Sequence, residues 1–404
     1  MMRTGKNPLL RTHRPTLPHG RRSRAAHLLT AAAAEGRFAL PQCRRCGAFA
    51  WPIPEACPHC LGAIALSEAP RGARVIAATT AEVPADPYFR ERAPWHVGLV
   101  QMDCGPQALV HLHPGAEPRD AVRLSLVLDR AGAAVLHAAL QGGTMSDPQL
   151  REMTADPRDR RVLITDARHV AALPLACALS AAGAAAVYAG VPEDWKPLPR
   201  RAEFEAIVGL KLVPLDISSD RSVADLARDI GDRIEILVNT ADLPRPGPLS
   251  APAAATDARA MMEIMAMGLL RLARSFGPAM ARRGADGTVA WVNVLSVYSR
   301  IHPAALAGYA AAHAAALALS HALRAELAQG GVRLMTVLAA PTEDEWFQSF
   351  GPIRVSGRAL AGAILSGLHR GLEEVVVGDL AHDLLARLAE NPKAVERELT
   401  RDLF

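Results

Sequence analysis

Short apolar runs between residues 72 and 140 follow the pattern of β-strands. Five of them, rich in Val, Leu and Ala, are separated by turn residues: ARVIAATTAEV, HVGLVQMD, QALVHLHP, AVRLSLVLD and AAVLHAAL. Runs of this length, bounded by Gly, Pro and Asp, are typical of strands in small all-β domains. Five strands suffice for a closed barrel of the OB type, and we predict that architecture here.

From residue 160 onward, apolar strands alternate with helices. The strand-like runs are RVLIT, AAVYAG, LKLVPLD, IEILVNT, TVAWVNVLS, VRLMTVLAA and EVVVGD. Helix-like runs lie between them, including VAALPLACALSAA, SVADLARDIG and two long segments around residues 256–283 and 305–328. This alternation predicts an α/β domain with a parallel, doubly wound sheet of the Rossmann type.

Residues 141–159 are polar and turn-rich, and predict a linker between the two patterned regions. We therefore expect a multidomain chain: a basic tail over residues 1–24, a first domain over 25–140, the linker, and a second domain over 160–404. The first 34 residues hold seven Lys or Arg and no acid. A disordered tail is the simplest interpretation, with a transit peptide or an anion-binding arm as alternatives.

The composition is that of a globular protein, with 50% hydrophobic and 21% charged residues. The apolar stretch over residues 170–191 has the length of a membrane span. It consists mostly of Ala and contains Pro174 and Gly183, so we predict a buried helix followed by a buried strand, and no membrane contact. No secretory signal is visible, and a cytoplasmic location is expected.

Two Cys-x-x-Cys pairs, separated by ten residues, predict a metal site. Each pair can place two thiolates about 2.3 Å from one Zn²⁺, and two pairs complete a tetrahedral shell with no open position. The site is therefore structural; zinc is expected, with iron in a rubredoxin-like variant as the alternative. Cys104 and Cys177 lie outside the pattern and are expected to be ordinary buried thiols. The four ligands are Cys43, Cys46, Cys57 and Cys60.

Zinc ribbons and OB barrels both occur in proteins that bind nucleic acid. Such binding needs a basic groove with stacking aromatic side chains. Aromatic residues are few here, namely Tyr88, Phe89 and Trp95, and the strands carry little excess charge. We therefore predict no nucleic-acid partner.

The order of features over residues 25–140 resembles the zinc-ribbon plus OB-fold proteins that accompany thiolases and thiolase-like acyl-CoA enzymes. The resemblance rests on EGRFALPQC, the four-cysteine ribbon, RGARVIAATTAEV, PYFRERAPWHVGLVQMDCGPQALVHL and AVRLSLVLD. It implies a non-catalytic partner of a thiolase-type subunit that helps to hold an acyl-CoA. The acyl group stays open.

Residues 160 to about 380 resemble the short-chain dehydrogenase/reductase family. The matching features are an Asp after the third strand, the segment NTAD at the fourth, and a Ser on the fifth strand thirteen residues before a Tyr. The resemblance implies a cofactor site that includes Thr165, Asp216 and Asn239. It also implies a catalytic set at Ser296, Tyr309 and the position of His313.

The cofactor loop departs from the family pattern. TDARHVAAL stands where the family has Thr-Gly-x-x-x-Gly-x-Gly, so Asp166, Val170 and Ala172 occupy the three glycine positions. Their side chains fill space that the pyrophosphate needs. A like-charge pair at about 4 Å costs roughly 4 kcal/mol at an effective dielectric constant of 20, so Asp166 disfavours a phosphate. At the second strand, Gly190 and Val191 supply no ribose ligand.

The catalytic set departs as well. Met265 stands at the position of the family's Asn, removing the polar anchor of a helix kink and a water relay. His313 replaces Lys; with an ordinary pKa of about 6.5, it is protonated only roughly a quarter of the time at pH 7. It either aids Tyr309 weakly or packs as a structural residue. Pro341–Thr342 replaces a Pro-Gly pair.

Together, these departures favour an accessory or scaffolding subunit of an acyl-CoA-processing, β-oxidation-like complex, whose Rossmann domain binds no NAD(P). That domain is expected to contact itself or an active dehydrogenase through the Ala-rich run ALAGYAAAHAAALALSHALRAEL. The alternative is an active NAD(P)-dependent short-chain dehydrogenase acting on a hydroxyacyl-CoA or an alcohol. Ser296 would then polarise the substrate, and Tyr309 would act as acid/base.

Overall fold

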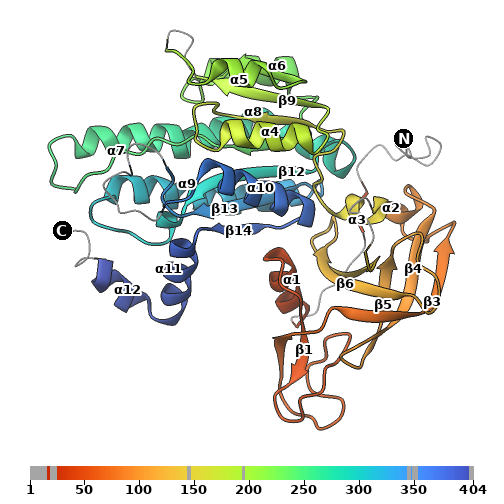
Figure 1. The fold of residues 1–404 in the computed structure, drawn as a ribbon. Coiled ribbons are helices and arrows are strands. Elements are labelled where there is room, and N and C mark those ends of the chain that lie inside the picture. Colours follow the sequence, from red (N-terminus) through yellow and green to blue (C-terminus); the bar gives the residue numbers. More distant parts are fainter. Residues whose placement is uncertain are drawn as a thin grey trace. The chain divides into compact units, whose positions relative to one another are not determined.

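The computed structural model describes residues 16–18, 25–142, 147–192, 196–343, 347 and 354–399 (Figure 1). Most of the predicted basic tail, including all of its Lys and Arg residues, lies outside the described residues. The chain forms two compact units, and the division falls between Asp156 and Pro157. The short segment His369–Leu372 groups with the first unit.

The first unit begins with a helix and a zinc-ribbon hairpin. Helix α1 (Ala26–Ala34) precedes strand β1 (Ala39–Cys43), which pairs antiparallel with β2 (Ile64–Glu68). The long connection between these two strands carries both cysteine pairs. Phe38 and Leu40 are buried in the core that this hairpin shares with the barrel.

Five strands then close into a barrel in the order β3-β4-β5-β7-β6. Buried and exposed side chains alternate along the strands, as on β6, where Val122 and Leu124 are fully buried. Helix α3 (Pro148–Met153) follows the barrel. The barrel elements are β3 (Gly72–Ala81), α2 (Pro87–Arg90), β4 (Trp95–Met102), β5 (Gln107–Leu112), β6 (Ala121–Leu128) and β7 (Ala134–Leu140).

The second unit is a seven-stranded parallel sheet with the order β10-β9-β8-β11-β12-β13-β14. Every residue of the central strands β11, β12 and β13 is buried, as expected for strands covered on both faces. The strands are β8 (Arg161–Ile164), β9 (Ala186–Val191), β10 (Leu210–Pro214), β11 (Ile236–Asn239), β12 (Ala290–Ser296), β13 (Arg333–Ala339) and β14 (Glu374–Val377).

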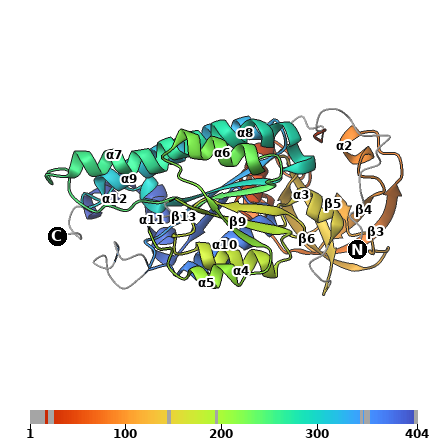
Figure 2. The same ribbon diagram turned by 90° about the horizontal axis from the view of Figure 1, so that it is seen from above.

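Helices cover both faces of this sheet (Figure 2). On one face lie α4 (Ala172–Ala181), α5 (Arg201–Glu205) and α10 (Gly357–Arg370); on the other lie α6 (Asp220–Ile230), α7 (Ala254–Met262), α8 (Gly268–Gly287) and α9 (Ala307–Ala328). Helices α11 (Asp379–Glu390) and α12 (Pro392–Leu399) end the described chain. The predicted zinc ribbon, OB barrel and doubly wound Rossmann domain are thus confirmed.

One local expectation needs correction, and the region of Met265 adds a feature that the sequence did not show. A π-helical turn, η1 (Glu263–Met267), joins α7 to α8, so the irregularity persists although Met265 provides no polar anchor. Met265 is instead buried in the core. Cys177 is exposed and Cys104 is only partly buried, so the prediction of two ordinary buried thiols was wrong for Cys177.

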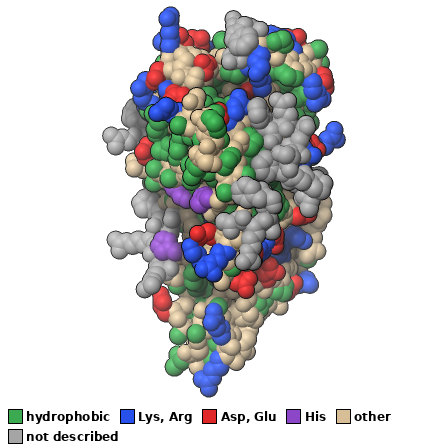
Figure 3. Space-filling model, turned by 90° about the vertical axis from the view of Figure 1, so that its left-hand side faces the viewer, with side chains coloured by type: hydrophobic (Ala, Val, Ile, Leu, Met, Phe, Trp, Pro, Cys, Tyr) green, Lys and Arg blue, Asp and Glu red, His purple; other side chains and the backbone are tan. Residues whose placement is uncertain are grey.

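The surface view in Figure 3 faces the side on which α7 begins. Hydrophobic side chains gather in the upper half of this face, with acidic and basic side chains between them.

Within the described part of the chain, no helix has the length and apolar character needed to cross a bilayer.

Candidate functional site

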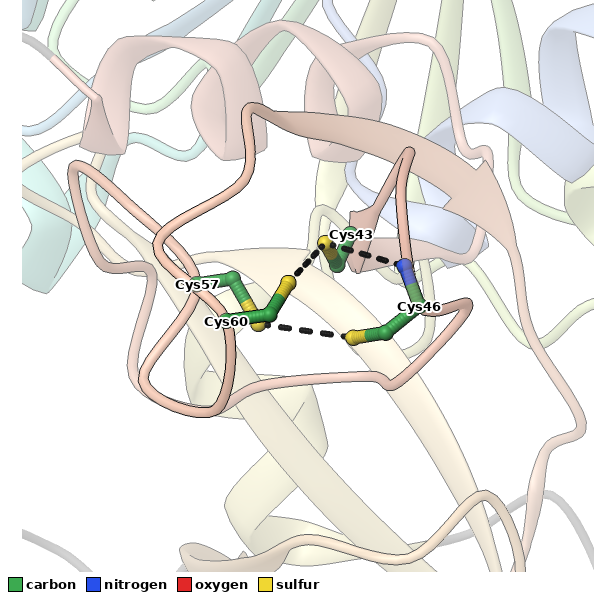
Figure 4. Close-up of side chains that lie close together, drawn as sticks. All are labelled: Cys43, Cys46, Cys57 and Cys60. Atoms are coloured by element: carbon green, nitrogen blue, oxygen red, sulfur yellow. Dashed lines mark hydrogen bonds between the residues drawn. The ribbon is translucent and has the colours of Figure 1, made fainter.

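The two cysteine pairs converge on one point (Figure 4). All four sulfur atoms lie within 4.8 Å of one another. The Sγ atoms of Cys43 and Cys60 are 3.5 Å apart, and those of Cys46 and Cys57 are 3.6 Å apart. Four sulfurs bound to one Zn²⁺ at about 2.3 Å would be separated by roughly 3.8 Å, so the arrangement fits a tetrahedral metal shell.

Backbone donors and neighbouring thiols give this site the electrostatics of a metal centre. The N–H groups of Cys46 and Arg45 donate to the Cys43 sulfur, and they lower the pKa of Cys43 to about 6. The N–H of Gly62 also favours the Cys60 thiolate, but the adjacent thiols, led by Cys43, and burial raise the pKa of Cys60 to about 12. Four thiolates this close need a cation, which Zn²⁺ would supply without redox chemistry.

A second polar cluster lies at the carboxyl edge of the Rossmann sheet. Tyr309 and His313, one turn apart on α9, are 2% and 1% exposed, and their ring centroids are 4.3 Å apart. Ser296 ends β12, and its N–H donates to His313 Nδ1 at 3.2 Å. Its hydroxyl accepts the N–H of Tyr298 at 3.2 Å, capping a short 3₁₀ turn. The three residues predicted as a catalytic set therefore lie together.

Asp242 completes this cluster. It follows β11, and its Oδ2 accepts a hydrogen bond from the Tyr309 hydroxyl at 3.0 Å. Its Oδ1 lies 3.4 Å from His313 Nε2, a long electrostatic contact rather than a well-aligned hydrogen bond. Burial alone would raise the pKa of Asp242, but the contact with His313, and then His169 and Tyr309, outweigh it and lower that pKa below 3.8. The carboxylate is thus ionised at neutral pH.

The hydrogen bond from Ser296 and the contact with Asp242 together fix which nitrogen of the His313 ring carries the proton. Because Nδ1 accepts the N–H of Ser296, Nδ1 carries no proton, and in the neutral ring the proton lies on Nε2, facing Asp242. Protonating Nδ1 would set two donors against each other and break the contact with Ser296. His313 is therefore poorly placed to act as the fixed cation that a Lys provides at this position.

The remaining predicted cofactor residues bond to the protein itself. Thr165 Oγ1 donates to Asn239 Oδ1 at 3.0 Å and accepts the N–H of Thr240 at the same distance, tying β8 to β11. Asp216 Oδ1 accepts both the N–H and the hydroxyl of Ser218, at 2.9 and 2.6 Å, in the turn before α6. Thr165 and Asn239 thus lie together, whereas Asp216 serves a separate turn.

Three N–H groups in and at the end of the loop between β8 and α4 donate to acceptors of the loop itself. The N–H of Arg168 donates to Asp166 Oδ1 at 2.8 Å, and that of Ala171 donates to His169 Nδ1 at 3.2 Å. The N–H of Ala172 donates to the His169 carbonyl at 2.8 Å. Burial raises the pKa of Asp166 to about 6; the N–H and the charge of Arg168 oppose that rise, and the charge of Asp242 adds to it.

Three stretches of the chain match known protein families. Residues 30–66 match the rubredoxin-like zinc ribbon domain of ChsH2, and residues 66–127 match the C-terminal OB-fold domain of ChsH2. Residues 160–352 match the short chain dehydrogenase family. A solved short-chain dehydrogenase from Burkholderia cenocepacia, in complex with NADP, shares 31% identity and a TM-score of 0.54, over 60% of this chain and 98% of that one.

The second unit of this chain belongs to the short-chain dehydrogenase family. The first carries ChsH2-type zinc-ribbon and OB-fold domains, so the chain is a fusion of the two. A short-chain dehydrogenase from Streptomyces avermitilis shares the fold of the second unit at 21% identity and a TM-score of 0.51, over 59% of this chain and 96% of that one.

Curated relatives match part of the dehydrogenase domain. The NADPH-dependent 1-acyldihydroxyacetone phosphate reductase of Schizosaccharomyces pombe is 32% identical over 137 residues, 32% of this chain and 44% of that protein. Short-chain dehydrogenase PC-15 of Penicillium crustosum is 30% identical over 147 residues, 35% of this chain and 51% of that protein. The chain spans about half the length of these relatives.

Two residues of the dehydrogenase domain were missed from the sequence. Asp242 is the fourth residue of NTAD, a segment that drew attention to Asn239, and 67 positions separate it from Tyr309. His169 lies inside the loop that lacks the three glycines of the family pattern, but its role as an acceptor depends on the loop conformation. An acidic residue at the end of NTAD was the one available signal.

Proposed function

We propose that this chain is an accessory or scaffolding subunit of an acyl-CoA-processing complex of the thiolase type. The observation that carries the proposal is the pairing of a four-cysteine ribbon with an OB barrel, both matching ChsH2 domains, in one unit of the chain. The ribbon holds one structural Zn²⁺. The barrel faces a thiolase-type subunit and helps to hold its acyl-CoA.

In this proposal, the dehydrogenase domain binds no NAD(P). The residues of the β8–α4 loop do not fit a dinucleotide, because Asp166 accepts the N–H of Arg168 within the loop and His169 accepts the N–H of Ala171 just before the helix. At the other end, the Tyr309 hydroxyl donates to Asp242 rather than toward a substrate.

The dehydrogenase domain then serves association. Helices α8 and α9 pack together, and each keeps an exposed surface. On the π-turn and α8, Met267 and Leu270 are 44% and 42% exposed, which is high for large apolar side chains. On α9, small exposed residues allow a partner helix to approach closely. These residues are Ala311, Ala318, Ala322 and Ala325. The partner is a second copy of this chain or an active dehydrogenase.

The second candidate function is an active NAD(P)-dependent dehydrogenase for a hydroxyacyl-CoA or an alcohol. It is favoured by the 31% identity to a dehydrogenase in complex with NADP, and by the retention of Ser296 and Tyr309, each in contact with His313.

Titrating the zinc-loaded, full-length protein with NADPH and with NADH separates the two candidates. The scaffold proposal predicts no binding by calorimetry up to millimolar cofactor. Micromolar binding of either nucleotide, together with turnover lost in Tyr309→Phe, would establish the dehydrogenase instead.

A further inference from the structure

Two aspartates follow neighbouring strands in the region that holds the cofactor in this family. Asp166 lies in the loop between β8 and α4, and Asp242 follows β11, the strand that pairs with β8. The two segments are bonded to each other, because the N–H of Asp166 donates to the hydroxyl of Thr240, two residues before Asp242, at 3.2 Å. Both lie at the carboxyl edge of the parallel sheet, where ligands of doubly wound folds bind.

Asp166 provides at the loop what a bound phosphate would provide. Backbone N–H groups of such a loop and of the helix start bind anions when they have no other partner. Here the Asp166 carboxylate accepts the N–H of Arg168 at 2.8 Å, and the His169 ring accepts the N–H of Ala171 at 3.2 Å. An incoming phosphate would have to displace both acceptors and would meet the Asp166 charge.

The loop is also covered from the side of α10. A Cβ added at Gly357, the first residue of that helix, would lie 2.2 Å from the carbonyl oxygen of Val170 and 3.3 Å from the N of Ala171. The helix start therefore packs directly on the loop. This packing holds the loop in the conformation in which its own side chains take its donors.

Asp242 plays the corresponding part at the catalytic end. Its Oδ2 accepts the Tyr309 hydroxyl at 3.0 Å, and its Oδ1 faces the Nε2 proton of His313 at 3.4 Å. The Asp242 side chain is 19% exposed, so the charge lies in a largely water-free site. The donor that the family directs at its substrate is thus held by the chain itself.

We infer that Asp166 and Asp242 act as internal anions that close the dinucleotide site, and that they are the residues which make this domain reject NAD(P). The inference rests on the proposed absence of cofactor binding and names its cause. The alternative cause, steric filling by Val170 and Ala172 at the other two glycine positions, is separable by mutation.

The charges set the size of the effect. At neutral pH both carboxylates are largely ionised, because the pKa of Asp166 is about 6 and that of Asp242 is below 3.8. One like-charge contact at about 4 Å and an effective dielectric constant of 20 weakens binding of an anion roughly a thousandfold. Solvent near the partly exposed Asp242 reduces this, so removing each charge should tighten binding by at least about tenfold.

The test uses the full-length, zinc-loaded protein and NADPH as the probe, with binding measured by calorimetry and by nucleotide fluorescence. The double variant Asp166→Gly/Asp242→Gly should bind NADPH with a micromolar Kd, whereas the natural chain shows none up to millimolar concentration. The variant Val170→Gly/Ala172→Gly, which keeps both aspartates, should stay without binding. Asp225→Asn/Asp229→Asn, on the surface helix α6, matches the change in net charge and should also show no binding.

Each outcome decides the inference. If Val170→Gly/Ala172→Gly binds NADPH and the aspartate variant does not, side-chain bulk closes the site and the inference is wrong, while the scaffold proposal stands. If the natural chain already binds at micromolar concentration, both fail. Should the glycine variant lose its fold by circular dichroism, Asp166→Asn/Asp242→Asn keeps the side-chain volume and removes both charges. It should bind NADPH at least about a hundredfold more tightly than the millimolar limit of the natural chain, and no binding would overturn the inference.

Discussion

Replacing Asp242 with alanine should destabilise the dehydrogenase domain, and the structure gives the size of the effect. The substitution removes the hydrogen bond that the Tyr309 hydroxyl, in a side chain only 2% exposed, donates to the Asp242 carboxylate at 3.0 Å. Losing a hydrogen bond to a charged group costs about 1.5–3 kcal/mol. The weaker contact with His313 at 3.4 Å adds less than about 1 kcal/mol. We expect Asp242→Ala to lower the free energy of unfolding of this domain by about 2–3 kcal/mol.

The assay is a double-mutant cycle of Asp242→Ala and Tyr309→Phe. Unfolding of the dehydrogenase domain in urea is measured by hydrogen exchange of the backbone amides in α9. A signal specific to this domain is needed because a chain with two units does not unfold in one two-state step. The two changes should be non-additive by about 1–2 kcal/mol, since each removes the same bond. Asp225→Ala, on the exposed face of α6, is the control and should stay within about 0.5 kcal/mol of the natural chain. Additive changes, or an Asp242→Ala effect no larger than the control, would refute the reasoning about this cluster.

Three further predictions concern the metal, the barrel and the sheet. Cys57→Ser should abolish the single zinc per chain seen by metal analysis, whereas Cys104→Ser should retain it, because only Cys57 belongs to the thiolate shell. In the barrel unit, His137 lies 2.9 Å from Asp147, and although burial alone would raise the pKa of Asp147, the contact with His137 holds it below 3.8. The stability from this lowered pKa is present above about pH 3.8 and is lost as pH falls further. Asp147→Asn should therefore make the free energy of unfolding depend less steeply on pH in acid. An unchanged slope would show that the pair does not cause the loss of stability. Gly190→Ala should destabilise the sheet by about 1–3 kcal/mol in thermal unfolding, because the new Cβ would lie 2.3 Å from the Thr165 carbonyl oxygen. Gly362 is at an exposed position of helix α10, and no atom lies within 4 Å of the Cβ that an alanine would add there. Gly362→Ala should therefore stabilise the domain by up to about 1 kcal/mol. Equal effects at the two sites would contradict the argument from packing.

Much of the fold was predictable because its signals are local. The alternation in AVRLSLVLD and the turn residues around it predict β6, which runs from Ala121 to Leu128. The uniform apolar character of VRLMTVLAA predicts a strand buried on both faces, and β13 is such a strand. The cysteine site is predictable from spacing, because two Cys-x-x-Cys knuckles supply the four thiolate ligands of one tetrahedral ion.

The polar cluster of the dehydrogenase domain could not be predicted in the same way. The bond between Tyr309 and Asp242 joins a helix to the end of a strand 67 positions earlier, and it forms only when the parallel sheet brings β11 beside the start of α9. The proton position on His313 depends on the N–H of Ser296, a backbone group whose direction no sequence pattern reveals. The π-turn at Met265 was not predictable for a similar reason, because it depends on how neighbouring elements pack. Met265 is buried in the core there, where a polar anchor was expected in the family pattern.

The association of this chain with a thiolase-type subunit is the central claim, and isolation of the tagged, full-length protein from its native host tests it most directly. Native mass spectrometry of the purified material should show a complex in which a thiolase-type subunit, identified by peptide sequencing, is present in a fixed ratio to this chain. The complex should disappear when Cys57→Ser removes the ribbon zinc. A chain that emerges alone, or that carries only dehydrogenase subunits, would contradict the account.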